Sequence, residues 1–175
     1  EGRFLAPKGE HLSDAPLDWG LSAAFHDINH DGLPDLYVCN DFWTPDRFWI
    51  NQGGVFKLLD PKNLSKTSAS SMGVDFSDYD RDGDVDLFVV DMLSRDLAMR
   101  KRQAPAQDLS DRLVNQGKYA DQAMRNTLLN NRGDGSFAEL ANMAGLTASD
   151  WSWSPVFLDV DLDGYEDLII TAGHY

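Results

Sequence analysis

Apolar and polar residues alternate along most of this chain in runs of five to seven residues, and turns rich in Gly, Asn and Asp separate the runs. A period of two is typical of β-strands with two distinct faces, and such turns favour antiparallel hairpins. We predict ten strands in three units. They are Leu21–His26, Asp35–Cys39, Arg47–Asn51 and Val55–Leu59 in the first unit, Met72–Ser77, Asp86–Met92, Arg125–Asn130 and Ser136–Leu140 in the second, and Trp153–Leu158 and Asp167–Thr171 in the third.

The strand pattern belongs to an internal repeat. The line F-x-D-x-[DN]-x-D-G-x-x-D-L occurs at 25–36, 76–87 and 157–168, and Gly-rich hairpins that end in Phe alternate with it at 51–56 and 130–137. A repeat of about 50 residues with four short antiparallel strands is the pattern of a β-propeller blade. The predicted fold class is therefore all-β, with about three blades' worth of a partial β-propeller.

The second unit is 30 residues longer than the first, and we place the excess at 94–124. Good helix formers fill 96–103, Pro105 ends that run, and 108–114 has the composition of a further turn or two. We therefore predict a helical insertion within the second blade. Seven Lys and Arg residues against five Asp lie between 91 and 127. A solvated excursion and a basic contact surface for a partner are both compatible with this charge.

The bulk composition excludes several kinds of partner and covalent link. Net charge is −14, and thirteen of the 29 acidic residues lie in the three repeated loops, so the acidity is concentrated there. Nucleic acid is not an expected partner, because binding to its backbone needs a basic face. No apolar run approaches the ~20 residues of a membrane span. Cys39 is the only cysteine, which excludes an intrachain disulfide, and we expect it to be buried.

Residues 1–175 are expected to form one propeller segment of a longer protein. Two whole blades, one leading strand and half a trailing blade would leave open sheet edges, which natural β-proteins avoid. The remaining blades of the parent propeller are then the first expected partner.

The repeated loops carry the candidate chemistry. Oxygen side chains stand at loop positions 1, 3, 5 and 9, Gly at position 6 allows the turn, and position 7 offers its backbone carbonyl. Together they supply about 6–7 oxygens, the range that Ca²⁺ prefers. We predict up to three Ca²⁺ sites. Their ligands are Asp27, Asn29, Asp31, Leu33 and Asp35 in the first, Asp78, Asp80, Asp82, Asp84 and Asp86 in the second, and Asp159, Asp161, Asp163, Tyr165 and Asp167 in the third.

An EF-hand loop and an Asp-rich turn without a metal are the two alternative interpretations of these loops. An EF-hand requires Glu at position 12 and flanking helices, whereas position 12 is Val38, Val89 or Ile170 within strand-like sequence. Asp-rich turns without a metal are the second alternative, but clustered carboxylates without a cation repel one another. The first loop carries Asn29 and the fewest acidic residues, so we expect it to be the weakest site.

These loops and hairpins resemble the FG-GAP, or VCBS, repeat family of integrin-like β-propellers. The stretches 91–96, 124–128 and 150–153 are similar to bacterial proteins related to cartilage acidic protein, which often carry an ASPIC/UnbV segment. The resemblance implies Ca²⁺ at the three loops and a secreted, periplasmic or cell-surface location. It also implies a role in recognition or adhesion.

The expected function is a non-catalytic, Ca²⁺-binding scaffold that recognises a protein or carbohydrate ligand. No paired nucleophile and base is visible, so no catalytic residue is predicted. A propeller-type polysaccharide lyase or hydrolase and a subunit of a larger cell-surface assembly are the alternatives. The tryptophans are expected to pack within the blades rather than to form a sugar-binding platform. The Arg-Gly-Asp sequence at 132–134 is attributed to the hairpin motif and not to adhesion.

Overall fold

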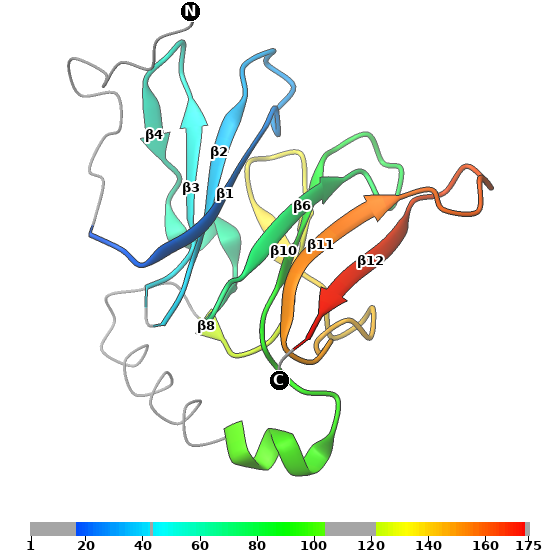
Figure 1. The fold of residues 1–175 in the computed structure, drawn as a ribbon. Coiled ribbons are helices and arrows are strands. Elements are labelled where there is room, and N and C mark those ends of the chain that lie inside the picture. The colour runs from blue at the N-terminus through cyan, green and yellow to red at the C-terminus, as the bar shows by residue number, and fades with distance from the viewer. Residues whose placement is uncertain (1–16, 43, 104–121, 174–175) are drawn as a thin grey trace, which may run out of the picture.

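The computed structural model describes residues 17–42, 44–103 and 122–173. Three antiparallel sheets stand side by side in it (Figure 1). The first has the order β1 (Gly20–His26), β2 (Asp35–Asn40), β3 (Arg47–Asn51) and β4 (Phe56–Leu58). The second has the order β6 (Gly73–Ser77), β7 (Asp86–Val90), β9 (Thr127–Asn131) and β10 (Phe137–Glu139), and the third pairs β11 (Ser152–Leu158) with β12 (Asp167–Ala172).

The all-β fold class is confirmed, and every predicted strand is present to within two residues at each end. The strands of each blade pair in chain order, as in a propeller blade, although the insertion and β8 (Gln122–Ala123) lie between β7 and β9 in the second blade. A further pair went unpredicted. The two-residue strands β5 (Thr67–Ser68) and β8 (Gln122–Ala123) run parallel to each other. Bridges this short have no sequence periodicity that would reveal them.

The insertion begins with helical residues 97–103. Asp96 caps this helix, since its Oδ1 accepts the backbone N–H groups of Ala98 and Met99 at 2.9 Å each. The further turn predicted at 108–114 lies outside the described residues. At its far end the insertion returns as strand β8 rather than as helix. A short 3₁₀ helix, η1 (Pro61–Leu64), lies between β4 and β5. No described helix is long and apolar enough to cross a membrane.

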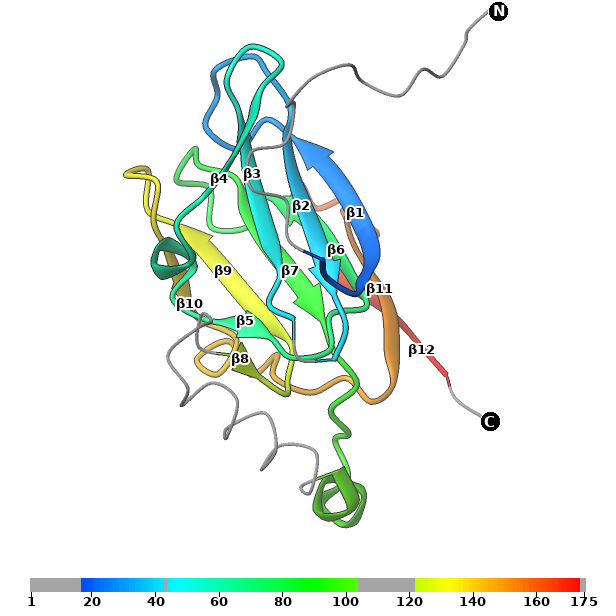
Figure 2. The same ribbon diagram turned by 90° about the vertical axis from the view of Figure 1, so that its left-hand side faces the viewer.

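Strand β7 is the centre of the packing. All five of its residues are buried, because the first sheet covers one face and the third sheet covers the other (Figure 2). Leu87 and Val89 join a cluster with Tyr37 and Phe48 of the first sheet. Phe88 and Val90 join a second cluster that includes residues of the third sheet. The continuous apolar run in β7 is therefore the signature of a blade covered on both sides.

The inner strands β1, β6 and β11 lie next to one another, and glycine makes one of these contacts possible. A Cβ on Gly73 would lie 2.8 Å from the carbonyl oxygen of Trp153, closer than side chains tolerate. Asp75 of β6 also accepts the backbone N–H of Phe157 in β11 at 2.7 Å. The Phe157 N–H points away from β12, and this hydrogen bond gives it a partner at that edge of the sheet.

Two carboxylates are buried at the end of the sheets opposite the repeated loops. Asp46 is 3% exposed, and it accepts hydrogen bonds from the Tyr37 and Ser71 hydroxyls, at 2.7 Å each, and from the Asn40 N–H at 2.8 Å. All three donors are neutral. Burial raises the pKa of Asp46 to about 7, and the charge of buried Asp91 contributes in the same direction.

The raised pKa predicts a pH effect on stability. The folded protein holds the Asp46 proton more tightly than the unfolded chain does, so the contribution to the free energy of unfolding is largest at low pH. It falls as the pH rises from about 4 to about 7, by up to roughly 4 kcal/mol. Asp46→Asn should flatten this fall in urea denaturation with a chelator present. Asp60→Asn, at an exposed carboxylate, is the matched control, and an unchanged slope in Asp46→Asn would contradict the assignment.

Candidate metal centre

The three repeated loops connect the first and second strands of each sheet and therefore lie at one end of the blades (Figure 1). Each loop folds on its first aspartate, whose carboxylate accepts the backbone N–H of the glycine at position 6. The distances are 2.9 Å for Asp27, 3.1 Å for Asp78 and 2.9 Å for Asp159. These glycines have φ of 84°, 94° and 87°, a conformation that glycine adopts readily.

The aspartate at position 9 joins the loop to the third strand of the same blade. Asp35 accepts the N–H of Ile28 in its own loop at 3.2 Å and the N–H of Asn51 at 2.8 Å. Asp86 makes the equivalent bond to the N–H of Asn131 at 2.8 Å. The aspartate therefore ties together the two ends of a blade's repeat motif.

The asparagine of the hairpin motif completes this link. The Asn131 side chain donates to the Val85 carbonyl at 3.1 Å and accepts the Gly133 N–H at 3.1 Å. Asn51 donates to Pro34 and accepts from Gly54 in the same way, at 3.0 and 2.8 Å. This role of the asparagine was not predicted from the sequence. The available signal was an Asn two residues before the first glycine of each hairpin motif, at Asn51 and Asn131.

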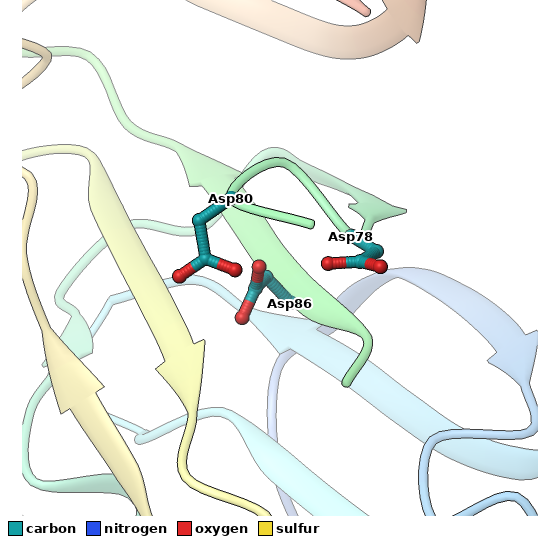
Figure 3. A group of neighbouring side chains, drawn as sticks. All are labelled: Asp78, Asp80 and Asp86. Carbon is teal, nitrogen blue, oxygen red and sulfur yellow. The ribbon is translucent and has the colours of Figure 1, made fainter. Parts of the chain in front are cut away.

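The second loop gathers its carboxylates most closely. Asp78 and Asp80 from the loop and Asp86 from the start of β7 turn toward one another, with one oxygen of each within 4.8 Å of the others (Figure 3). Asp78 Oδ1 and Asp86 Oδ2 are buried and have no hydrogen-bond partner among the described residues. Burial raises the pKa of Asp86 to about 7, and the Asp80 and Asp82 charges raise it further.

This arrangement fits a hard divalent cation. Every donor is an oxygen, the unpartnered oxygens are buried, and bound positive charge would offset both the desolvation and the mutual repulsion. Ca²⁺ is the ion that such short carboxylate loops favour. The neighbouring Asn130 amide donates to Asp80 at 2.8 Å and to Asp86 at 3.2 Å, which holds these two carboxylates in place.

The other two loops differ in detail. Asp159, Asp161 and Asp163 of the third loop also bring their oxygens within 4.8 Å of one another. In the first loop position 3 is Asn29, whose amide donates to Asp31 at 3.2 Å, and no comparable carboxylate group forms among the described residues there. Burial also raises the pKa of Asp35, although the Asn51 and Ile28 N–H groups oppose this.

Several predicted ligands lie in other contacts. The Asp82 carboxylate accepts the Asp84 N–H at 2.9 Å, and the Asp84 carboxylate lies against Gly133 of the hairpin. Asp167 is exposed at the start of β12 and accepts the Val160 N–H at 3.2 Å. The predicted carbonyl ligands at position 7, which are Leu33, Asp84 and Tyr165, stay a prediction.

Adjacent loops also contact each other through their fourth residues, which share a positive φ. His30 of the first loop lies with its Nε2 2.9 Å from the Gly83 carbonyl oxygen of the second. The Arg81 guanidinium of the second loop stacks 3.8 Å above the Tyr165 ring of the third. A change in one loop therefore has a direct physical route to the next.

Blades of four antiparallel strands and acidic loops between their first and second strands define a class: repeat proteins of the β-propeller type. The family model described as an FG-GAP-like repeat matches residues 27–89 and 113–170, and the chain belongs to this family. No curated protein matches the chain.

The link between loop and hairpin predicts the effect of one substitution. Asn131→Ala removes three side-chain hydrogen bonds at a buried position, to Ile28, Val85 and Gly133, and should lower the free energy of unfolding by about 1–3 kcal/mol. Asn142→Ala, at an exposed asparagine, is the control and should change it by less than about 0.5 kcal/mol. Equal effects in urea denaturation would show that the link does not stabilise the blade.

Proposed function

We propose that this chain is a Ca²⁺-stabilised, non-catalytic propeller scaffold that recognises a protein or carbohydrate ligand outside the cytoplasm. The observation that supports it most is the carboxylate group of the second loop, with two buried oxygens that lack a partner among the described residues. Membership in the FG-GAP-like repeat family agrees with a propeller-type scaffold.

The ions would act on the structure rather than on a substrate. Each loop is bonded to its own hairpin or strand and contacts its neighbour, so a cation that neutralises the carboxylates would stiffen this end of the blades. Extracellular Ca²⁺ modules bind with Kd values of about 10⁻⁴–10⁻³ M, so such sites fill in a secreted, periplasmic or cell-surface setting. The closer relationship to the ASPIC/UnbV-associated group and the contact with further blades belong to the same proposal.

Two alternatives have their own tests. A polysaccharide lyase or hydrolase would turn over a glycan, so an array of glycans assayed for both binding and cleavage distinguishes it from a scaffold. A subunit of a larger assembly would use the insertion as its contact. Deleting 94–124 and measuring oligomer size and partner binding tests that role, and unchanged values would count against it.

Calcium uptake is the direct test of the metal sites. After exhaustive chelation, titration calorimetry should show binding, and the melting temperature should rise with Ca²⁺ because the folded state alone holds the complete sites. Asp31→Ala, Asp82→Ala and Asp163→Ala should each weaken one site, and the first loop should bind most weakly. Absence of both heat and thermal shift would contradict the proposal.

Asp86→Asn should affect the melting temperature differently with a chelator and with Ca²⁺. With a chelator present, the variant should melt at the same temperature as the parent or higher, because a buried charge beside Asp80 and Asp82 is gone and the amide oxygen still accepts the Asn131 N–H. With Ca²⁺ present, it should lose part of the rise in melting temperature. Asp60→Asn should keep the full rise, and an Asp86→Asn variant that kept it as well would remove Asp86 from the ligand set.

A further inference from the structure

The end of the sheets opposite the metal loops holds two adjoining cavities. The inner strands β1, β6 and β11 each run into a metal loop, so their first residues lie at this other end. Cavities of about 600 and 570 Å³ open here, and both are lined by Met92 and Trp151. Their volumes fall within the roughly 300–1,000 Å³ that is typical of ligand sites.

The 570 Å³ cavity has an unusual lining of methionine and aromatic side chains. Met72, Met92 and Met124 contribute to it, together with Phe42, Trp151 and Trp153. Four of the five methionines in the chain line one or both cavities. Methionine is flexible and polarisable, so it adapts to apolar ligands, while indole faces attract positive charge.

Two of the tryptophans depart from the expectation that they pack inside the blades. Trp153 is 51% exposed and lines this cavity, and Trp19 is 64% exposed and packs edge-on against Phe42 at 5.6 Å between ring centres. Trp49, in contrast, is buried as predicted. Large aromatic side chains left exposed beside a cavity are typical of binding surfaces.

The lining of the 570 Å³ cavity carries a negative charge. Asp41 is the one ionisable side chain among the described residues that line it. Below the lining, fully buried Asp91 accepts the backbone N–H groups of Ser70 at 3.1 Å and of Met92, and both residues line the cavity. Asp46 is buried nearby. In the part of the chain that the structure describes, these three carboxylates form no ion pair with Lys or Arg.

We propose that the cavity lined by Met72, Met92 and Trp153 binds a small organic cation, a quaternary or tertiary ammonium with an apolar body. The apolar body packs on the methionines and indole rings, and the cationic group faces Asp41 above the buried Asp91. An anion would meet the negative charge of Asp41 in this lining, with Arg102 only in the adjoining cavity, and a neutral apolar ligand would leave Asp41 unused. This site lies apart from the metal loops and goes beyond the scaffold role proposed for them.

Burial raises the pKa of Asp91 to about 6, which agrees with a carboxylate whose hydrogen-bond donors are neutral and which forms no ion pair among the residues that the structure describes. A cation held above it would supply that charge. The aromatic and methionine lining would take the place of the water around a quaternary ammonium, which is weakly hydrated and needs no hydrogen bond.

The test uses the whole 175-residue chain labelled with ¹³C at its methionine methyl groups. Phenyltrimethylammonium is titrated to roughly 10 mM, which covers even weak binding. The signals of Met72, Met92 and Met124 should shift with saturation. Met143 is 85% exposed and lies outside both cavities, so its signal should stay in place as an internal control. No saturable shift, or an equal shift at Met143, would overturn the proposal.

Charge recognition is tested separately. Choline should bind more tightly than its neutral carbon analogue 3,3-dimethylbutanol, and equal affinities would reduce the site to a plain apolar cavity and overturn the assignment. Asp41→Asn should weaken binding of phenyltrimethylammonium about fivefold, as expected for a partly exposed charge pair. Trp153→Ala should weaken it as well, whereas Asp60→Asn should leave it unchanged. The titrations are run once with Ca²⁺ and once with a chelator. Binding of phenyltrimethylammonium in both conditions would support this cavity site whether or not the acidic loops bind Ca²⁺.

Discussion

The aspartate at the ninth position of the first two acidic loops is the constraint on which the loop-bearing end of these blades depends. Asp35 and Asp86 bond to the third strand of their blade while they face the loop carboxylates. The same group therefore aligns the strands and closes the loop. Its burial makes a bare negative charge costly there, and a bound divalent cation would offset this cost.

The blades carry different chemistry at their two ends because strand direction sorts the connections. Loops from first to second strands gather carboxylates at one end, and the starts of the inner strands gather Met and Trp at the other. The buried strand β7 lies between them, packed on both faces. The two ends therefore present different side chains, carboxylates at one and methionine and indole groups at the other.

The strands and loops were predictable because their determinants are local. The carboxylate of Asp159 reaches a glycine N–H only five residues away, and the strands alternate within six or seven residues. The parallel bridge of β5 and β8 and the burial of Asp46 and Asp91 were not predictable. They depend on partners 23 to 54 residues away that no periodic pattern marks. The exposure of Trp153 was missed for the same reason.

The sequence by itself determined the repeat, the four-strand blade and the turn of each acidic loop, since backbone sterics and short-range hydrogen bonds decide these. The tertiary structure alone decided how deeply each copy of the repeat is buried. β7 is buried on both faces and β12 is largely exposed, although both follow the same loop. Asp86 is therefore desolvated, and its counterpart Asp167 is not. Burial is a property of the surroundings, and packing between blades supplies those surroundings from distant parts of the chain.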